Sequence, residues 1–155
     1  MKIAVITGEE SGDKLAASAI KELKLQYKKN IYLFGIGGNA LKKQGIDNLF
    51  DISEINVMGL IEVLPKVLKI NKIINKIVDK IIETKPDIVF TVDSPDFTLR
   101  VARRIKSKKR ELKIIHYVAP SVWAWRPGRI KTVKKSIDHL LTILPFEKKS
   151  LTLTI

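Results

Sequence analysis

Short apolar runs alternate with amphipathic stretches along most of the chain. The apolar runs are rich in β-branched residues and predict strands over residues 2–7, 31–36, 87–93, 113–118 and 138–144. Apolar side chains that recur every three or four positions predict helices over residues 12–29, 39–45, 65–84, 94–109 and 126–136. The stretch DISEINVMGLIEVLP, residues 51–65, follows neither period, so we expect a loop with short helical turns there.

This alternation predicts an α/β fold, a Rossmann-like doubly wound parallel sheet with helices on both faces. In such sheets, ligands bind beyond the carboxyl ends of the strands. Polar clusters follow four of the predicted strands at that end: GEESGD, GIGGN, DSPDF and APSVWAWR. The sequence therefore predicts a ligand site at the carboxyl edge of the sheet.

Composition narrows the classes of function. A length of 155 residues suits about one domain, and the absence of cysteine excludes disulfides, thiolate metal sites and a cysteine nucleophile. The two histidines are too few for most metal sites, so we expect neither a metal nor a cofactor. No apolar run of about 18 residues is free of charge, so we expect no membrane-spanning helix. These features fit a reducing cytoplasm.

The formal net charge is +13, which favours nucleic acid, anionic lipid or phosphorylated substrates as partners. The alternative is a compositional origin, because Lys, Ile and Asn recur together in KINKIINKIVDKII, as an AT-rich genome would favour. No recognition helix or RNA-binding motif accompanies the charge, so we expect no nucleic-acid partner.

The turn GEESGD, residues 8–13, has the strand-to-helix geometry of an anion site. However, Glu9, Glu10 and Asp13 would repel a phosphate, and carboxylates suit sugar hydroxyls or acid–base chemistry better. We predict that Glu9 and Ser11 bind substrate. The alternative is that Ser11 or Asp13 caps the following helix.

The turn GIGGNA matches G-x-G-x-x-A through Gly35, Gly37 and Ala40. It is a weak dinucleotide signal, because it follows the second predicted strand and no acidic residue closes the next strand at the expected spacing. We count Gly37 and Gly38 as candidate substrate contacts. The alternative is that the glycines only allow a tight turn.

DSPDF places Asp93 at the end of a predicted strand and Asp96 three residues later. A carboxylate at that edge can deprotonate an attacking hydroxyl, so Asp93 is the candidate catalytic residue and Asp96 a candidate substrate contact. The alternative is that Asp96 stabilises the helix N-terminus and Asp93 forms a turn.

The loop after the fourth predicted strand combines aromatic and cationic residues between two stiffening prolines. Tryptophan can stack on sugar rings, and arginine can hold phosphate. The alternative is that the tryptophans belong to the core. The candidate substrate contacts here are Ser121, Trp123, Trp125, Arg126 and Arg129.

The helix from Pro65 has a wide apolar arc flanked by lysines, as an interfacial helix has. The alternative is an ordinary amphipathic helix packed on the sheet. The candidate membrane contacts are Ile61, Val63, Leu64, Val67, Ile70, Lys66, Lys69 and Lys72.

Six stretches, in this order, resemble the lipid-A-disaccharide synthase family: GEESGD, FGIGG, LFDISEINVMGLIEVLP, PDIVFTVDSPDF, HYVAPSVWAWRPGRIK and LTILPFE. The resemblance covers about residues 2–149. It implies the N-terminal half of an inverting glycosyltransferase of the two-domain GT-B type, working on the cytoplasmic face of the inner membrane.

The resemblance also implies a reaction. The family transfers a sugar from UDP-2,3-diacylglucosamine to 2,3-diacylglucosamine 1-phosphate, which gives lipid A disaccharide 1-phosphate and UDP. Asp93 matches the family's candidate general base for the acceptor's 6-hydroxyl, and Glu9 and Ser11 match its acidic turn. Lysines near the helix from Pro65 would meet anionic headgroups of the inner-membrane surface.

The family is more than twice as long as this sequence, and its C-terminal domain carries most of the UDP-sugar site. We therefore expect an acceptor-side domain over residues 1–149, an atypical tail over residues 150–155 and no UDP-sugar-binding domain. This predicts a truncated or split half that needs a separate C-terminal half for activity. The alternative is an inactive remnant that only folds and binds membrane.

Overall fold

The computed structural model describes residues 1–27, 30–50, 63–119 and 133–143. Its strands are β1 (Lys2–Thr7), β2 (Tyr32–Ile36), β3 (Ile46–Asn48), β4 (Ile88–Val92), β5 (Lys113–Tyr117) and β6 (His139–Leu141). Its helices include α1 (Glu10–Gln26), α2 (Asn39–Lys43), α4 (Val63–Thr84) and α5 (Pro95–Lys108). The five predicted strands are confirmed, and so are the helices predicted over residues 12–29, 39–45, 65–84 and 94–109, with ends that differ by a few residues. Most of the helix predicted over residues 126–136 and most of the loop predicted over residues 51–65 lie outside the described residues.

The strands form one sheet in the order β3-β2-β1-β4-β5-β6, and every pair is parallel. From β1 the chain winds outward through β2 and β3, then returns to the other side of β1 for β4, β5 and β6. The order therefore reverses between β1 and β4, which is where doubly wound sheets bind ligands.

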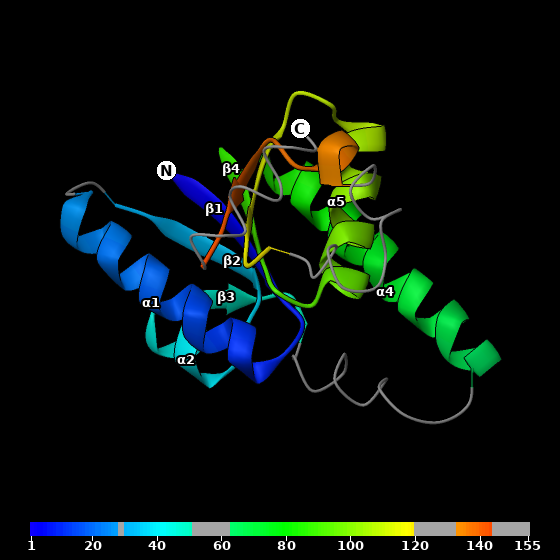
Figure 1. Cartoon of the computed structure of the whole chain (residues 1–155), viewed down its shortest axis with the longest axis horizontal. Helices are drawn as coiled ribbons and strands as arrows, with labels where there is room; N and C mark the ends of the chain where they lie inside the picture. Colours follow the sequence, from blue (N-terminus) through cyan, green and yellow to red (C-terminus); the bar gives the residue numbers. More distant parts are fainter. Residues whose placement is uncertain (28–29, 51–62, 120–132, 144–155) are drawn as a thin grey trace.

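Helices cover both faces of the sheet, as Figure 1 shows: α1 and α2 lie on one side, and α4 and α5 pack together on the other. Alternate residues of β1 belong to two different core clusters, one on each face of the sheet. Ile3 and Val5 join the cluster under α1, whereas Ala4 and Ile6 join the cluster under α4 and α5. Burial on both faces explains why the central strands read as continuous apolar runs.

The short edge strand β3 was not predicted from the sequence. It contains one buried apolar residue, Ile46, and it follows Gly45, whose φ of +77° permits the turn after α2. A three-residue strand on a sheet edge carries too little periodic signal to be recognised.

Helix α4 begins at Val63, two residues before the Pro65 at which the sequence predicted its start. Along the described part of the chain, no helix is both long enough and apolar enough to cross a membrane.

Candidate functional site

The carboxyl ends of β1 and β4 lie side by side at the point where the strand order reverses, since Thr7 pairs with Val92. The turns that follow approach each other closely. A Cβ on Gly8 would lie 2.7 Å from the Cβ of Ser94, and a Cβ on Gly12 would lie 3.1 Å from the carbonyl oxygen of Val92. Glycine at positions 8 and 12 therefore lets the first turn of α1 pack against the DSPDF turn.

Asp93 is held at this junction by its backbone. Its N–H donates to the carbonyl of Tyr117 at 3.0 Å, and its own carbonyl accepts from Thr98 Oγ1 at 2.7 Å. Its φ is +52° and that of Ser94 is +43°, a left-handed conformation that non-glycine residues adopt at a cost of about 1–3 kcal/mol. Strain of this size persists where the surrounding contacts over-determine the backbone, and it is common at functional sites.

The side chain of Asp93 is half-buried, and Ser11 Oγ donates to its Oδ2 at 3.4 Å. The sequence analysis placed Ser11 and Asp93 at the same edge of the sheet, and the structure brings them into contact. Glu9 is exposed on the same turn, and Asp96 is exposed in the first turn of α5. Carboxylates from two strand ends thus gather at one edge.

Glu10 is also exposed, but it is paired along its own helix. Lys14 Nζ lies 2.9 Å from Glu10 Oε1, and this hydrogen bond and ion pair lower the pKa of Glu10. Glu10 is therefore part of the surface of α1.

Asp13 has a role that the sequence did not predict. Its carboxylate is 1% exposed and accepts from three backbone N–H groups: Gly38 at 2.7 Å, Ala40 at 2.8 Å and Leu41 at 3.2 Å. Asp13, which lies on the neighbouring helix α1, therefore caps the N-terminus of α2. The alternative that Ser11 or Asp13 caps α1 is wrong, because α1 begins after Glu9 without a side-chain cap.

Backbone polar groups of the GIGGN turn are hydrogen-bonded to other residues of the protein. Besides the hydrogen bonds that Asp13 accepts, two more join this turn to Asn48. Asn48 Oδ1 accepts from the N–H of Gly37 at 3.0 Å, and Asn48 Nδ2 donates to the carbonyl oxygen of Gly37 at 2.9 Å. Gly35 lies inside β2 with a φ of +138°, and a Cβ there would come within 2.0 Å of the Val5 carbonyl oxygen. These glycines serve close backbone packing, which supports the tight-turn interpretation over a dinucleotide site.

His116 is a buried residue of the site that the sequence analysis used only for counting. It lies on β5 opposite Thr91, whose Oγ1 is 2.8 Å from His116 Nδ1. Burial lowers the pKa of His116 to about 4, although the Asp93 carboxylate and the Val118 backbone act in the opposite direction. The sequence did carry a signal for His116, because Thr91 and His116 are polar residues inside two otherwise apolar strands.

The remaining candidates divide by position. Ile70 is half-buried and packs against the core cluster under α4, and Lys72 is exposed. The structure places residues 63–69 in α4 without describing their side chains, so the predictions for Val63, Leu64, Lys66, Val67 and Lys69 stay untested. Outside the described residues lie Ile61, Ser121, Trp123, Trp125, Arg126 and Arg129.

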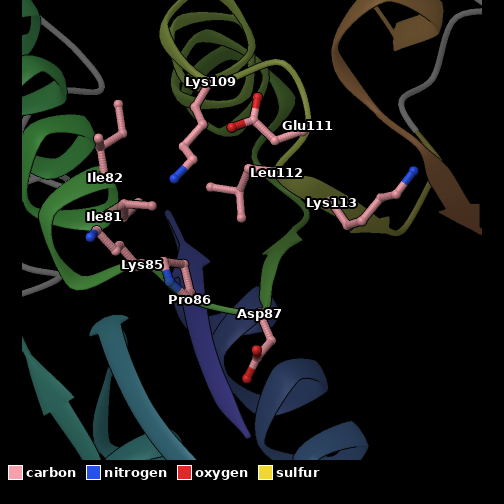
Figure 2. A pocket seen from close by; sticks show the side chains of 9 residues that line it. All are labelled: Ile81, Ile82, Lys85, Pro86, Asp87, Lys109, Glu111, Leu112 and Lys113. Atoms are coloured by element: carbon pink, nitrogen blue, oxygen red, sulfur yellow. The ribbon is translucent and has the colours of Figure 1, made fainter.

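Within the four described ranges, no group of three or more His, Asp or Glu side chains could hold a metal ion. A pocket of about 220 Å³ lies at the opposite, amino edge of the sheet, between the segments that enter β4 and β5 (Figure 2). Lys109 points into it over an apolar floor of Ile81 and Leu112. It is separate from the junction that holds Asp93.

A family model described as lipid-A-disaccharide synthetase matches residues 3–152. The chain belongs to the lipid-A-disaccharide synthetase family. The lipid-A-disaccharide synthase of Ruegeria pomeroyi is 42% identical over 147 residues, and that of Alcanivorax borkumensis is 45% identical over 150 residues. Each alignment covers 95% of this chain but only 36% and 38% of the relative, so the chain spans little more than a third of their length.

Solved structures confirm the fold. The UDP-GlcNAc 2-epimerase of Neisseria meningitidis superposes with a TM-score of 0.68 at 18% identity, over 100% of this chain and 43% of that one. MurG of Acinetobacter baumannii gives 0.57 at 12% identity, over 93% and 41%. The prediction of a Rossmann-like half of the GT-B type is therefore confirmed.

Proposed function

We propose that this chain forms the N-terminal, acceptor-side half of an enzyme that makes lipid A disaccharide 1-phosphate. The donor would be UDP-2,3-diacylglucosamine and the acceptor 2,3-diacylglucosamine 1-phosphate. The observation that carries the proposal is the position of Asp93, a half-buried carboxylate held by backbone bonds at the point where the strand order reverses. Membership of the family supplies the reaction.

In this proposal Asp93 acts as the general base. It takes the proton of the acceptor's 6-hydroxyl while that oxygen bonds to the anomeric carbon of the donor. The bond between the anomeric carbon and the UDP oxygen breaks, and UDP leaves with the electron pair. Ser11 orients the carboxylate, and Glu9, at the exposed rim, binds sugar hydroxyls.

The turn after β2 does not suit the diphosphate of the donor, because Asp13 and Asn48 already accept hydrogen bonds from its backbone N–H groups. We therefore assign the UDP-sugar site to a C-terminal domain like the one that completes the relatives. In this scheme residues 1–149 are the acceptor-side domain and residues 150–155 a tail. In this proposal Trp123 and Trp125 would contact the sugar of the acceptor, and Arg126 and Arg129 would bind its phosphate.

The start of α4 is the proposed contact with the inner-membrane surface on its cytoplasmic side. Both lipid substrates carry acyl chains, so apolar residues near Val63 and Leu64 would meet them, and Lys66, Lys69 and Lys72 would meet anionic headgroups. Each lysine near such a surface contributes about 1 kcal/mol. Flotation of the chain with vesicles, with and without anionic lipid, measures this contact.

The test of the function is a transfer assay with both lipid substrates. The complete enzyme, meaning this chain continued by the C-terminal part of the Alcanivorax borkumensis relative, should release UDP and form disaccharide. The chain alone should be nearly inactive, because a GT-B site lies between two domains. Robust turnover by the chain alone would contradict the two-domain proposal.

A second candidate is an inactive remnant that folds and binds membrane, and the partial coverage of the relatives is compatible with it. Binding of the chain to vesicles, with no downstream reading frame that encodes a C-terminal half, would support this candidate over the transferase.

A further inference from the structure

Thr98 is a buried polar side chain that binds the backbone of the candidate base. It lies near the start of α5 and is 0% exposed. Its Oγ1 lies 2.7 Å from the carbonyl oxygen of Asp93 and 3.1 Å from that of Ser94, and donates to both. A hydroxyl has a single hydrogen, so the two carbonyls share it, and the shorter contact is the one to Asp93.

The hydrogen bond to Asp93 differs from the one that a threonine in a helix ordinarily makes. Such a hydroxyl commonly binds the carbonyl four residues earlier, which for Thr98 is that of Ser94. The Ser94 carbonyl already accepts the backbone N–H of Thr98 at 3.0 Å and that of Phe97 at 2.9 Å. The hydroxyl lies closer to the carbonyl five residues earlier, so its main contact is with the candidate base.

The turn that Thr98 binds is strained. Asp93 and Ser94 have φ values of +52° and +43°, and Ser94 begins α5 without a side-chain cap. Residues other than glycine keep such a conformation only where surrounding contacts hold it. Two hydrogen bonds hold the backbone of Asp93, one from its N–H to the Tyr117 carbonyl at 3.0 Å and one from Thr98 to its own carbonyl. The second comes from a side chain, so a substitution can remove it.

Resting on the transferase function proposed above, we infer that Thr98 is a positioning residue whose hydroxyl holds the carbonyl of Asp93 and so fixes the direction of the carboxylate. Ser11 contacts the carboxylate itself, whereas Thr98 acts through the backbone. Thr98 is fully buried, so it holds the turn without contacting substrate. A displaced base slows the chemical step and leaves substrate binding intact, so the loss of this hydroxyl lowers kcat and spares KM.

Two substitutions separate the hydroxyl of Thr98 from its methyl group. Valine keeps the shape and removes the donor, whereas serine keeps the donor and removes a buried methyl. In the complete enzyme, Thr98→Val should lower kcat about 10-fold and leave KM for both substrates within about twofold. Thr98→Ser should keep more of kcat than Thr98→Val, even if the lost methyl makes it the less stable of the two. Unchanged kcat in Thr98→Val, or a kcat in Thr98→Ser that is no higher, overturns the inference.

Thr84→Val is the matched control. Thr84 is the last residue of α4, at the amino edge of the sheet and away from Asp93. Its Oγ1 donates to the carbonyl oxygen of Lys80 at 2.8 Å, the ordinary hydrogen bond four residues back. The substitution therefore removes the same kind of hydrogen bond, and kcat should not change. An equal fall of kcat in Thr84→Val and Thr98→Val overturns the inference.

Hydrogen exchange followed by NMR tests the hold on the turn without an activity assay. In Thr98→Val, the backbone N–H of Asp93 should exchange about 10-fold faster than in the unsubstituted chain, while that of Phe90, in the middle of β4, should not change. Equal exchange at Asp93 in both proteins overturns the inference.

A measurement on the unsubstituted chain keeps the inference testable if Thr98→Val does not fold. The hydroxyl proton of Thr98 should exchange slowly enough with water to give its own resonance, because the group is buried and hydrogen-bonded. The reference is the hydroxyl of Thr84, whose hydrogen bond is exposed. A Thr98 hydroxyl that exchanges as fast as that of Thr84 overturns the inference.

The proposed function fails separately from this inference. If the unsubstituted complete enzyme transfers no sugar, the transferase proposal is wrong and the inference falls with it. If it transfers sugar and Thr98→Val keeps its full kcat, only the role of Thr98 is overturned.

Discussion

The carboxylate of Asp13 on α1 accepts a 2.7 Å hydrogen bond from the backbone N–H of Gly38, the residue before α2. Asp13 lies in the first turn of α1, the helix that follows β1, and Gly38 lies in the turn that follows β2, so this bond joins neighbouring parts of the carboxyl edge. A Cβ on Gly38 would lie 2.8 Å from Asp13 Oδ2, which leaves room for no other side chain. A buried carboxylate of the protein thus accepts the N–H groups at the N-terminus of α2, which could otherwise bind an anion.

Asp13→Ala should lower the free energy of unfolding by about 3 kcal/mol, because three N–H groups lose a charged acceptor. For a domain of this size, that corresponds to a fall in Tm of roughly 6–12 °C. The measurement is urea and thermal unfolding followed by circular dichroism. Asp79→Ala is the matched control, since Asp79 is 63% exposed in its ion pair with Lys108 and its loss should change stability by less than about 1 kcal/mol.

The Asp13→Ala variant offers a second readout. Inorganic phosphate should raise its Tm more than that of the unsubstituted protein, because the N–H groups that Asp13 leaves are available to an anion. Equal effects of phosphate on both proteins would show that Asp13 does not stand where an anion would bind.

Gly8→Ala should destabilise the protein by about 1–3 kcal/mol, because the added Cβ would lie 2.7 Å from the Cβ of Ser94. Ser94→Gly should relieve that clash. It removes the Cβ and a hydroxyl without a partner among the described residues, at a φ of +43° that glycine adopts freely. The double variant should therefore be more stable than Gly8→Ala alone, measured as a double-mutant cycle. Additive effects would mean that positions 8 and 94 do not contact each other.

Stability should depend on pH through His116. Its pKa is about 4 in the folded chain against 6.5 ordinarily, so between these values the unfolded chain binds the extra proton. This contribution to stability is fully present above about pH 6.5 and is lost as the pH falls to about 4, by about 3 kcal/mol in total. Urea unfolding from pH 7 to 4 measures it. His116→Asn should flatten this part of the curve, and an identical slope in both proteins would contradict the assignment.

Much of the carboxyl edge was predictable from the sequence, because strand ends are marked by apolar runs that stop at polar residues. Asp93 was identified in this way, as the first polar residue after β4. Contacts across the layer were not predictable. The sequence around Asp13 suggests a cap of its own helix, α1. Only the packing of α1 against α2 brings its side chain to Gly38. His116 and Thr91 are each a polar residue inside an apolar run, which marks them in the sequence, but their contact depends on the register of β4 and β5.

The central claim is that Asp93 is the general base of a two-domain transferase. The most direct measurement is kcat of the complete enzyme with Asp93→Asn, which keeps the shape of the side chain and removes its basicity. The account predicts a loss of about 10²- to 10⁴-fold with normal folding, while Asp96→Asn, on the exposed first turn of α5, should lose far less. An Asp93→Asn enzyme that folds normally and keeps its full kcat would contradict the account.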